Sequence, residues 1–209
     1  MLKRNRAVAG FDRPHNLQFY GNYELPFGKG QQFAKTGPMA MLLGGWQTNW
    51  ILSRISGTPF TVLTSGTSLN APGNTQTADQ ILSNVAILGG HGVGQPYFDP
   101  NAFSADPNAN LPSGVQPRFG SSGRNLLRGP GLFNLDASIF RTFKISERFG
   151  LQFRGEMFGV TNTPAFANPG ATASAANRTL GVITKLNGYG EITSATGERQ
   201  ARFALKLTF

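Results

Sequence analysis

The sequence predicts an all-β fold, specifically an antiparallel transmembrane β-barrel fragment: about five long strands forming an open curved sheet, with two long irregular loops. Three observations predict it. Apolar and polar residues alternate with period two in five segments of about ten residues. Only 14% of the 209 residues are charged, against about 25% in a typical domain, while 17 are phenylalanine. Finally, the connections alternate between short and long, as they do in outer-membrane barrels.

The strands are expected near 15–27, 44–62, 131–145, 148–160 and 199–209, within one domain that covers 1–209. The last is the clearest, because RQARFALKLTF alternates strictly around Phe203, Leu205 and Leu207. Strands of this length suit a tilted crossing of a bilayer. The two loops, 63–130 and 161–198, are rich in Gly, Pro, Asn and Ser and show almost no periodicity.

The connections agree with one orientation of the strands. If the carboxyl end of the last strand lies on the periplasmic side, the short connections 28–43 and 146–148 also lie there. Both long loops then lie outside the cell, which is the arrangement of outer-membrane barrels.

The polar side of the alternation predicts a lumen face rich in amides and paired charges. Arg154 and Glu156 lie two residues apart on one face of a strand, within reach of an ion pair, and Arg202 on the next strand is expected to join them. The residues expected to line the lumen or contact a plug are Asn22, Glu24, Gln152, Arg154, Glu156, Arg202 and Lys206.

The apolar side predicts a lipid-facing surface with aromatic residues near the strand ends, where barrels meet the membrane interfaces. The residues expected there are Tyr23, Phe27, Trp46, Phe133, Phe143 and Phe149. A soluble β-sandwich also alternates with period two, so this alternative stays open. Its polar face, however, is usually richer in Lys and Glu.

The net charge of +9 fits two interpretations: loop lysines and arginines in an acid-poor chain, or binding to anionic lipid or lipopolysaccharide. Arg118, Arg124 and Arg128 cluster before the third strand and are either an anion site or a set that packs the loop. Asp12 and Arg13 are expected to form a local ion pair.

Several function classes lack support in the sequence. The chain has no cysteine, no apolar run of about 18 residues and no apolar segment typical of a signal peptide after its basic start. GGHGVG at 89–94 lacks the GK[ST] ending of a phosphate loop, and no catalytic motif is present. We therefore expect no enzyme activity, no cofactor or metal, and no nucleic-acid partner.

Four stretches carry a resemblance to a known family. They are FDRPHNLQFYGNYELPFGKG (11–30), LGGWQTNWILSRISGTPFTV (43–62), GRNLLRGPGLFNLDASIFRTFKISERFGLQFRGEMFGVTNTPAFANPG (123–170) and the terminal RQARFALKLTF (199–209). Together they resemble, in order, the carboxy-terminal part of TonB-dependent outer-membrane receptors, most closely the Oar-like group with a carboxypeptidase-regulatory-like domain.

The resemblance implies a Gram-negative cell outer membrane location and uptake of a scarce solute through a barrel of about 22 strands with an amino-terminal plug. This chain resembles the last five strands only, so Met1 is expected to be an arbitrary start. The implied partners are outer-membrane lipid and lipopolysaccharide, the N-terminal strands and plug, the barrel-assembly machinery, and TonB through the N-terminal region. The terminal strand of the family is its assembly signal, which corresponds here to Phe203, Leu205, Leu207 and Phe209.

Five strands alone leave two bare sheet edges, and each unpaired backbone group costs several kcal/mol in lipid. The chain is therefore expected to be the C-terminal fragment of a TonB-dependent transporter and not to transport by itself. Siderophore, oligosaccharide, peptide and cobalamin-like solutes all remain open. The alternative is a soluble or cell-surface β-sheet module for adhesion or carbohydrate binding.

Overall fold

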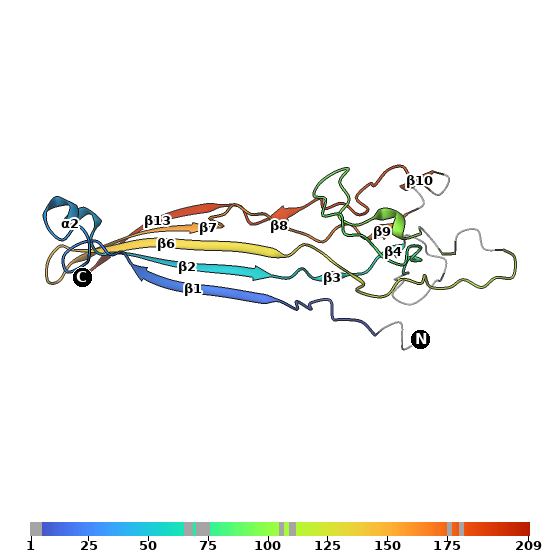
Figure 1. Ribbon diagram of the computed structural model, residues 1–209, viewed down its shortest axis with the longest axis horizontal. Coiled ribbons are helices and arrows are strands. Elements are labelled where there is room, and N and C mark those ends of the chain that lie inside the picture. The colour runs from blue at the N-terminus through green and yellow to red at the C-terminus, as the bar shows by residue number, and fades with distance from the viewer. Residues whose placement is uncertain are drawn as a thin grey trace. The chain divides into compact units, whose positions relative to one another are not determined.

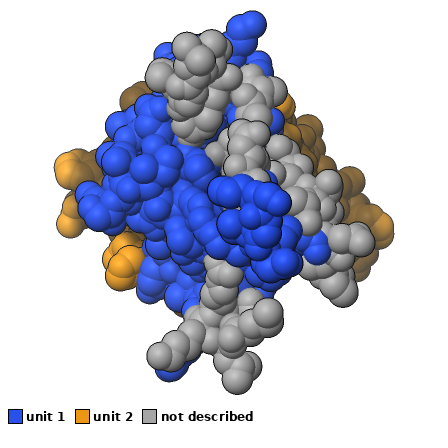
Figure 2. All heavy atoms as spheres, turned by 90° about the vertical axis from the view of Figure 1, so that its right-hand side faces the viewer, with its two compact units in different colours: residues 1–14, 56–131, 166–196 blue, residues 15–55, 132–165, 197–209 orange. Residues whose placement is uncertain are grey.

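The computed structural model describes residues 6–64, 69, 76–104, 107–108, 112–174, 177–179 and 182–209. The chain divides into two compact units, coloured separately in Figure 2. Unit 1 comprises residues 1–14, 56–131 and 166–196, and unit 2 comprises residues 15–55, 132–165 and 197–209. Each unit is described by itself below.

Unit 2 is built on one five-stranded antiparallel sheet, whose long strands lie side by side in Figure 1. Its strands are β1 (Asn16–Glu24), β2 (Trp46–Ile55), β6 (Leu132–Lys144), β7 (Gly150–Phe158) and β13 (Gln200–Thr208). The order β1-β2-β6-β7-β13 is the order of the sequence, and every neighbouring pair is antiparallel. The predicted five-stranded open sheet is confirmed, with β1 and β13 at its two edges.

The registers place alternate residues of all five strands on two continuous faces. Asn22 lies opposite Asn49, Asn49 opposite Ser138, and Ser138 opposite Glu156. These residues define the polar face, which Arg202 of β13 continues. The opposite side, which we name the apolar face, consists of Leu17, Phe19, Gly21, Tyr23, Trp46, Thr48, Trp50, Leu52, Arg54, Phe133, Leu135, Ala137, Ile139, Arg141, Phe143, Leu151, Phe153, Gly155, Met157, Ala201, Phe203, Leu205 and Leu207.

In two segments that belong to the predicted sheet or connect its strands, the observed elements differ from the predicted ones. The strand expected at 44–62 ends at Ile55, and only Pro59–Phe60 (β3) is extended again within that span. Gly57 explains the break, since a Cβ there would lie 1.9 Å from the Gly129 carbonyl oxygen. The segment 28–43, expected as a plain connection, contains the helix α2 (Gly37–Leu43) with Pro38 in its first turn.

Helix α2 belongs to unit 2, and Figure 1 shows it beyond the end of the sheet where β1 ends and β2 begins. Among the residues that the structure describes, no helix has the length and apolar character needed to cross a membrane.

Unit 1 is made mainly from the two segments expected as irregular loops. The described parts of these segments contain a 3-10 turn (Pro100–Ala102) and the short strands β4 (Leu63–Thr64), β5 (Leu127–Arg128), β8 (Ala165–Phe166), β9 (Thr172–Ala173), β10 (Arg178–Thr179), β11 (Val182–Ile183) and β12 (Ala195–Thr196). Strand β3 lies just before the first segment. Within unit 1, β3 pairs with β5 and β4 pairs with β9. Segments from both loops are thus joined by backbone pairing.

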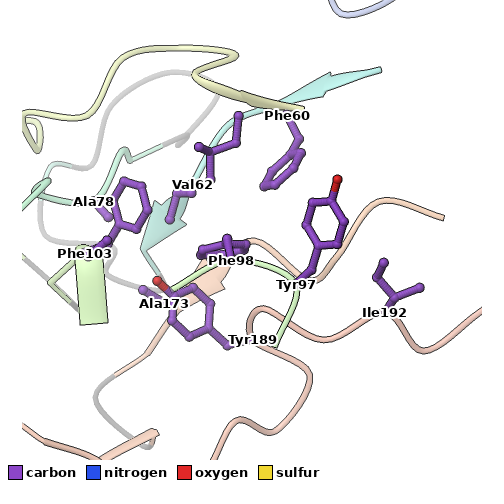
Figure 3. Close-up of a cluster of buried hydrophobic side chains, with 11 residues drawn as sticks. Phe60, Val62, Ala78, Tyr97, Phe98, Phe103, Ala173, Tyr189 and Ile192 are labelled. Atoms are coloured by element: carbon purple, nitrogen blue, oxygen red, sulfur yellow. The ribbon is translucent and has the colours of Figure 1, made fainter. Parts of the chain in front are cut away.

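A buried aromatic cluster holds unit 1 together. Phe98 is fully buried, and the centre of its ring lies 5.6 Å from that of Tyr189 and 5.8 Å from that of Phe60. Figure 3 shows these side chains gathered in one cluster. Phe103 and Val62 are also fully buried. Each such side chain contributes about 1.5–3 kcal/mol through removal from water, so these segments are packed despite their irregular sequence.

Candidate functional site

The polar face is hollowed near the middle of the sheet. An open groove of about 430 Å³ lies there, and all of its lining residues belong to unit 2. They are Tyr20, Gly21, Asn22, Asn49, Trp50, Ile51, Asp136, Ala137, Ser138, Phe140, Arg154, Glu156 and Phe158. Because side chains alternate along each strand, residues of β1, β2, β6 and β7 converge on this groove without any loop contribution.

A row of charges crosses the groove. The Arg154 Nη1 lies 3.5 Å from the Glu156 Oε1, so the ion pair predicted from the sequence is confirmed. The Arg154 guanidinium also lies 5.7 Å from the centre of the Phe140 ring. Arg202 faces Glu156 in the register, but its guanidinium stacks at 5.0 Å over Phe158, so cation–π contacts anchor both arginines.

The remaining residues predicted for the lumen lie on the same face. Glu24 accepts a hydrogen bond from the Gln47 amide at 2.9 Å. The Gln152 amide donates to the Thr142 hydroxyl at 3.2 Å, and Lys206 lies opposite Gln152 on β13. The sheet thus brings all seven predicted residues to one face, of which Asn22, Arg154 and Glu156 line the groove itself.

Sequence reasoning missed several groove residues. The Ser138 hydroxyl donates to the Asn49 side chain, and the Asp136 carboxylate accepts from the Gly159 N–H at 2.8 Å. Tyr20 and Ile51 add apolar walls. The period-two pattern already placed these positions on the polar side, so the missing information was which strands lie next to each other.

The apolar face is open to its surroundings. Phe203 is 76% exposed and Leu205 is 68% exposed, and most large apolar side chains of β1 and β13 are likewise exposed. A soluble sandwich buries this side against a second layer. An exposed surface of this kind marks a protein or membrane contact.

The predicted interface aromatics occupy both ends of the sheet. Tyr23, Trp46 and Phe143 lie on the apolar face at the end where β1 and β6 finish, and Phe149 directly precedes β7 at the same end. Phe133 lies at the opposite end, near the start of β6. Phe27 follows β1, and its ring lies 6.0 Å from that of Phe33.

The residues of the predicted assembly signal lie on an edge strand. Phe203, Leu205 and Leu207 belong to the apolar face of β13, and the terminal Phe209, which follows the strand, is 91% exposed. Their assembly role remains a prediction.

Two of the three arginines before β6, Arg118 and Arg128, pack the chain of unit 1, whereas no side-chain hydrogen bond or ion pair is found for Arg124 among the residues that the structure describes. Arg118 pairs with Asp79 at 2.7 Å, and Arg128 pairs with Asp12. The expected local pair between Asp12 and Arg13 is therefore wrong, since Arg13 donates to the Ser56 carbonyl at 3.0 Å instead. Asp12 follows a turn, in which its N–H donates to the Ala9 carbonyl at 2.9 Å, and the two neighbouring side chains have separate partners.

The glycine segment 89–94 is tied to the side chain of Glu191. The buried Glu191 accepts hydrogen bonds from the Gly94 N–H at 2.5 Å and from the Gly188 N–H at 2.6 Å. The Glu191 side chain thus already occupies the Gly94 N–H, which a phosphate loop would need as a free donor.

The polar face is suited to binding through hydrogen bonds and aromatic contacts. Within the described ranges, no three His, Cys, Asp or Glu side chains gather as a metal site would require. Amides, one ion pair and two arginine–aromatic stacks suit a polar solute or a protein surface as the partner.

Comparison with known families gives one match. Residues 1–202 match the family described as an outer membrane beta barrel domain. The description names the barrel and its membrane, and it assigns no TonB-dependent receptor. No curated protein and no solved structure was found to match the chain.

Proposed function

Because the chain belongs to the outer membrane beta barrel domain family, we propose that it forms the carboxy-terminal wall of a TonB-dependent receptor barrel of the Oar-like group, which takes up a scarce solute. Its place is the outer membrane, as the family implies. The proposed role is in transport and involves no catalysis. The observation that carries the proposal is the strand register, which places alternate residues of the five strands on one polar face and one apolar face.

The apolar face is proposed to meet lipid. Charged side chains on a lipid-facing surface reduce stability in the bilayer. The charged residues of the apolar face are Arg54 and Arg141, and each lies near one end of the sheet. An alternative is a soluble or cell-surface module for adhesion or carbohydrate binding. The exposed Phe203 and Leu205 count against its soluble form, because water disfavours such a surface.

The polar face is proposed to line the lumen and to contact a plug. Arg154, Glu156 and Lys206 would offer charges to it, and Asn22 and Asn49 would offer amides. Surfaces that hold a plug need many hydrogen bonds and fixed charges more than a deep pocket.

The two sheet edges are proposed to pair with further strands of the same barrel. β1 and β13 have one hydrogen-bonded neighbour each in the five-stranded sheet. Because five antiparallel strands leave the first and last parallel, two copies joined end to end would form a parallel seam, unlike known outer-membrane barrels. Additional strands, the barrel-assembly machinery and lipopolysaccharide are therefore the proposed partners.

A site-specific crosslinking experiment tests this proposal. A photo-crosslinking amino acid is placed at Lys206 on the polar face, or at Leu207 on the apolar face, in outer membranes of cells that make the whole receptor. The expected result is a protein adduct at position 206 and lipid adducts at position 207. Recovery of TonB with the crosslinked complex, increased by adding the transported solute, is expected for a receptor of this type. A complex that carries no plug adduct and retains no TonB contradicts the receptor assignment while leaving the barrel intact.

A further inference from the structure

Helix α2 exposes an apolar surface outside the sheet. It has no buried residue, and Met41 is 77% exposed while Leu42 and Met39 are exposed by more than half. A seven-residue helix is too short to be stable by propensity alone. Contacts with the rest of the chain must therefore stabilise α2, and its exposed apolar side chains favour contact with an apolar environment.

The sheet holds the helix by its carboxyl end. The Arg141 guanidinium donates to the Met41 carbonyl at 2.5 Å and to the Leu42 carbonyl at 2.7 Å, and the Trp46 indole N–H donates to the same Leu42 oxygen at 3.0 Å. These carbonyls have no hydrogen-bond partner within the helix, and a positive charge at this end also interacts favourably with the helix dipole.

Arg141 and Trp46 both belong to the apolar face, where the register places them opposite each other. Arg141 also lies 4.4 Å from the centre of the Phe143 ring. The carboxyl end of α2 therefore lies next to the end of the apolar face that carries Tyr23, Trp46 and Phe143.

A close crossing of two glycines fixes the base of the segment. A Cβ on Gly28 would lie 2.6 Å from the Cα of Gly44, and one on Gly44 would lie 2.5 Å from the Ala40 carbonyl oxygen. Only residues without side chains allow this approach. The helix is thus tied at Gly28, Gly44 and Arg141, which limits how far it can swing.

The charges of the segment are of one sign. Residues 25–45 contain Lys29 and Lys35 and no Asp or Glu, and both lysines are exposed. Interfacial helices combine an apolar surface with basic residues that attract anionic lipid.

We propose that α2 is an interfacial anchor that binds the headgroup and upper acyl region of an anionic phospholipid bilayer, next to the lipid-facing strands. The inference depends on the lipid-facing role proposed for the apolar face and not on coupling to TonB. Met39, Met41 and Leu42 enter the bilayer boundary, while Lys29 and Lys35 meet lipid phosphates.

Fluorescence quenching tests the anchor directly, and the absence of cysteine from this chain helps to make labelling specific. The whole receptor that contains this chain, with any cysteine elsewhere in it replaced, is prepared as Met41→Cys, Leu205→Cys, Ala204→Cys or Val93→Cys, labelled with nitrobenzoxadiazole and folded into phosphatidylcholine vesicles containing phosphatidylglycerol. Leu205 is the lipid-facing reference, Ala204 the polar-face reference and Val93, 86% exposed in unit 1, the aqueous reference.

The expected result is that brominated lipids quench the label at 41 at least about threefold more than at 93, and iodide does the reverse. If position 205 meets lipid while 41 behaves like 93, the anchor is wrong and the lipid-facing sheet stands. If neither 205 nor 41 meets lipid, both proposals are overturned.

Two further variants separate the anchor from general membrane binding. Arg141→Gln removes the tie to α2, so lipid quenching at 41 is expected to fall about twofold while 205 is unchanged. Arg54→Gln is the matched control, since Arg54 lies on the same face near the other end of the sheet. Replacing Lys29 and Lys35 by Gln is expected to abolish the gain in quenching at 41 that phosphatidylglycerol gives. Equal quenching at 41 in all these variants contradicts the proposed geometry.

Discussion

The Arg118 guanidinium donates to both carboxylate oxygens of Asp79, at 2.8 and 2.7 Å, across 39 residues of sequence. Asp79 also accepts the Ser121 N–H at 2.7 Å. This forked arrangement joins two parts of a segment that looks irregular in the sequence. It stabilises the ionised carboxylate, and the hydrogen bond from Arg118 is the main reason that the pKa of Asp79 lies below its ordinary value of 3.8.

The pair predicts a loss of stability in acid. Because the pKa of Asp79 is lower in the folded state, its contribution is complete above the unfolded value and declines as the pH falls below 3.8. Asp79→Asn is expected to cost about 1 kcal/mol at about pH 6, since the Arg118 side chain is more than half exposed and water screens the pair, and almost nothing at about pH 2.5. Urea unfolding at both pH values measures this difference, and Arg118→Gln removes its cause. A cost for Asp79→Asn that is equal at the two pH values contradicts the argument.

The aromatic cluster predicts a large packing effect at Phe98. Phe98→Ala removes a fully buried ring that contacts Phe60, Phe103 and Tyr189, and is expected to cost about 3–5 kcal/mol. Phe11→Ala makes the same chemical change at a residue of unit 1 that is 84% exposed, and should change stability by about 0.5 kcal/mol or less. Urea unfolding followed by near-ultraviolet circular dichroism compares the two, and equal costs would show that the cluster does not stabilise unit 1.

The sheet was predictable because its signal is periodic. The alternation placed Glu24, Arg154 and Lys206 on the polar side, and all three lie there. Even the residues that break the alternation have a place in the structure. Arg141 stacks near Phe143 and ties α2, while Phe140 supports Arg154 from the polar face.

The packing of unit 1 was not predictable because its contacts are long-range and aperiodic. Asp12 forms an ion pair with Arg128, and Glu191 accepts a hydrogen bond from the Gly94 N–H; no local sequence pattern predicts either contact. The helix α2 was not predicted because Gly37, Pro38 and Gly44 are residues typical of a loop. In addition, the side chains that stabilise it, Trp46 and Arg141, lie on strands and not on the helix itself. Groove residues such as Asp136 needed the order of the strands before their neighbours were known.

Gly28 predicts a steric requirement at the base of α2. Gly28 and Gly30 both have positive φ, at 109° and 83°, but only a Cβ on Gly28 would meet backbone, whereas nothing lies within 4 Å at Gly30. Gly30→Ala is expected to cost about 1–2 kcal/mol from backbone strain alone, and Gly28→Ala clearly more. Unfolding of the whole barrel carrying each substitution, in phospholipid vesicles and followed by tryptophan emission, measures the difference. Equal costs would show that the crossing of Gly28 and Gly44 relaxes easily.

The alternation of β13 predicts opposite outcomes for neighbouring substitutions. Leu205 lies on the apolar face opposite Phe153, and Ala204 lies on the polar face opposite Arg154; both are exposed. In Leu205→Arg the guanidinium enters the hydrocarbon, so about 2–4 kcal/mol of stability in the bilayer is expected to be lost. In Ala204→Arg the new side chain lies on the watery side, directly opposite Arg154 and two residues along the strand from the Arg202–Glu156 pair in the register. Water screens the repulsion between the two arginines, which limits the cost to about 1 kcal/mol.

Reversible unfolding of the whole barrel carrying each arginine substitution, in phospholipid vesicles, gives the free energies to compare. In detergent-free buffer the order is expected to change, since Leu205→Arg then removes exposed apolar surface and makes the chain more soluble. This change of order distinguishes a lipid-facing strand from a strand of a soluble sheet. A soluble sheet buries the side that carries Leu205, so Leu205→Arg would destabilise it both in vesicles and in buffer. Equal behaviour of the two variants in both solvents would contradict the assignment of β13 to the wall of a barrel.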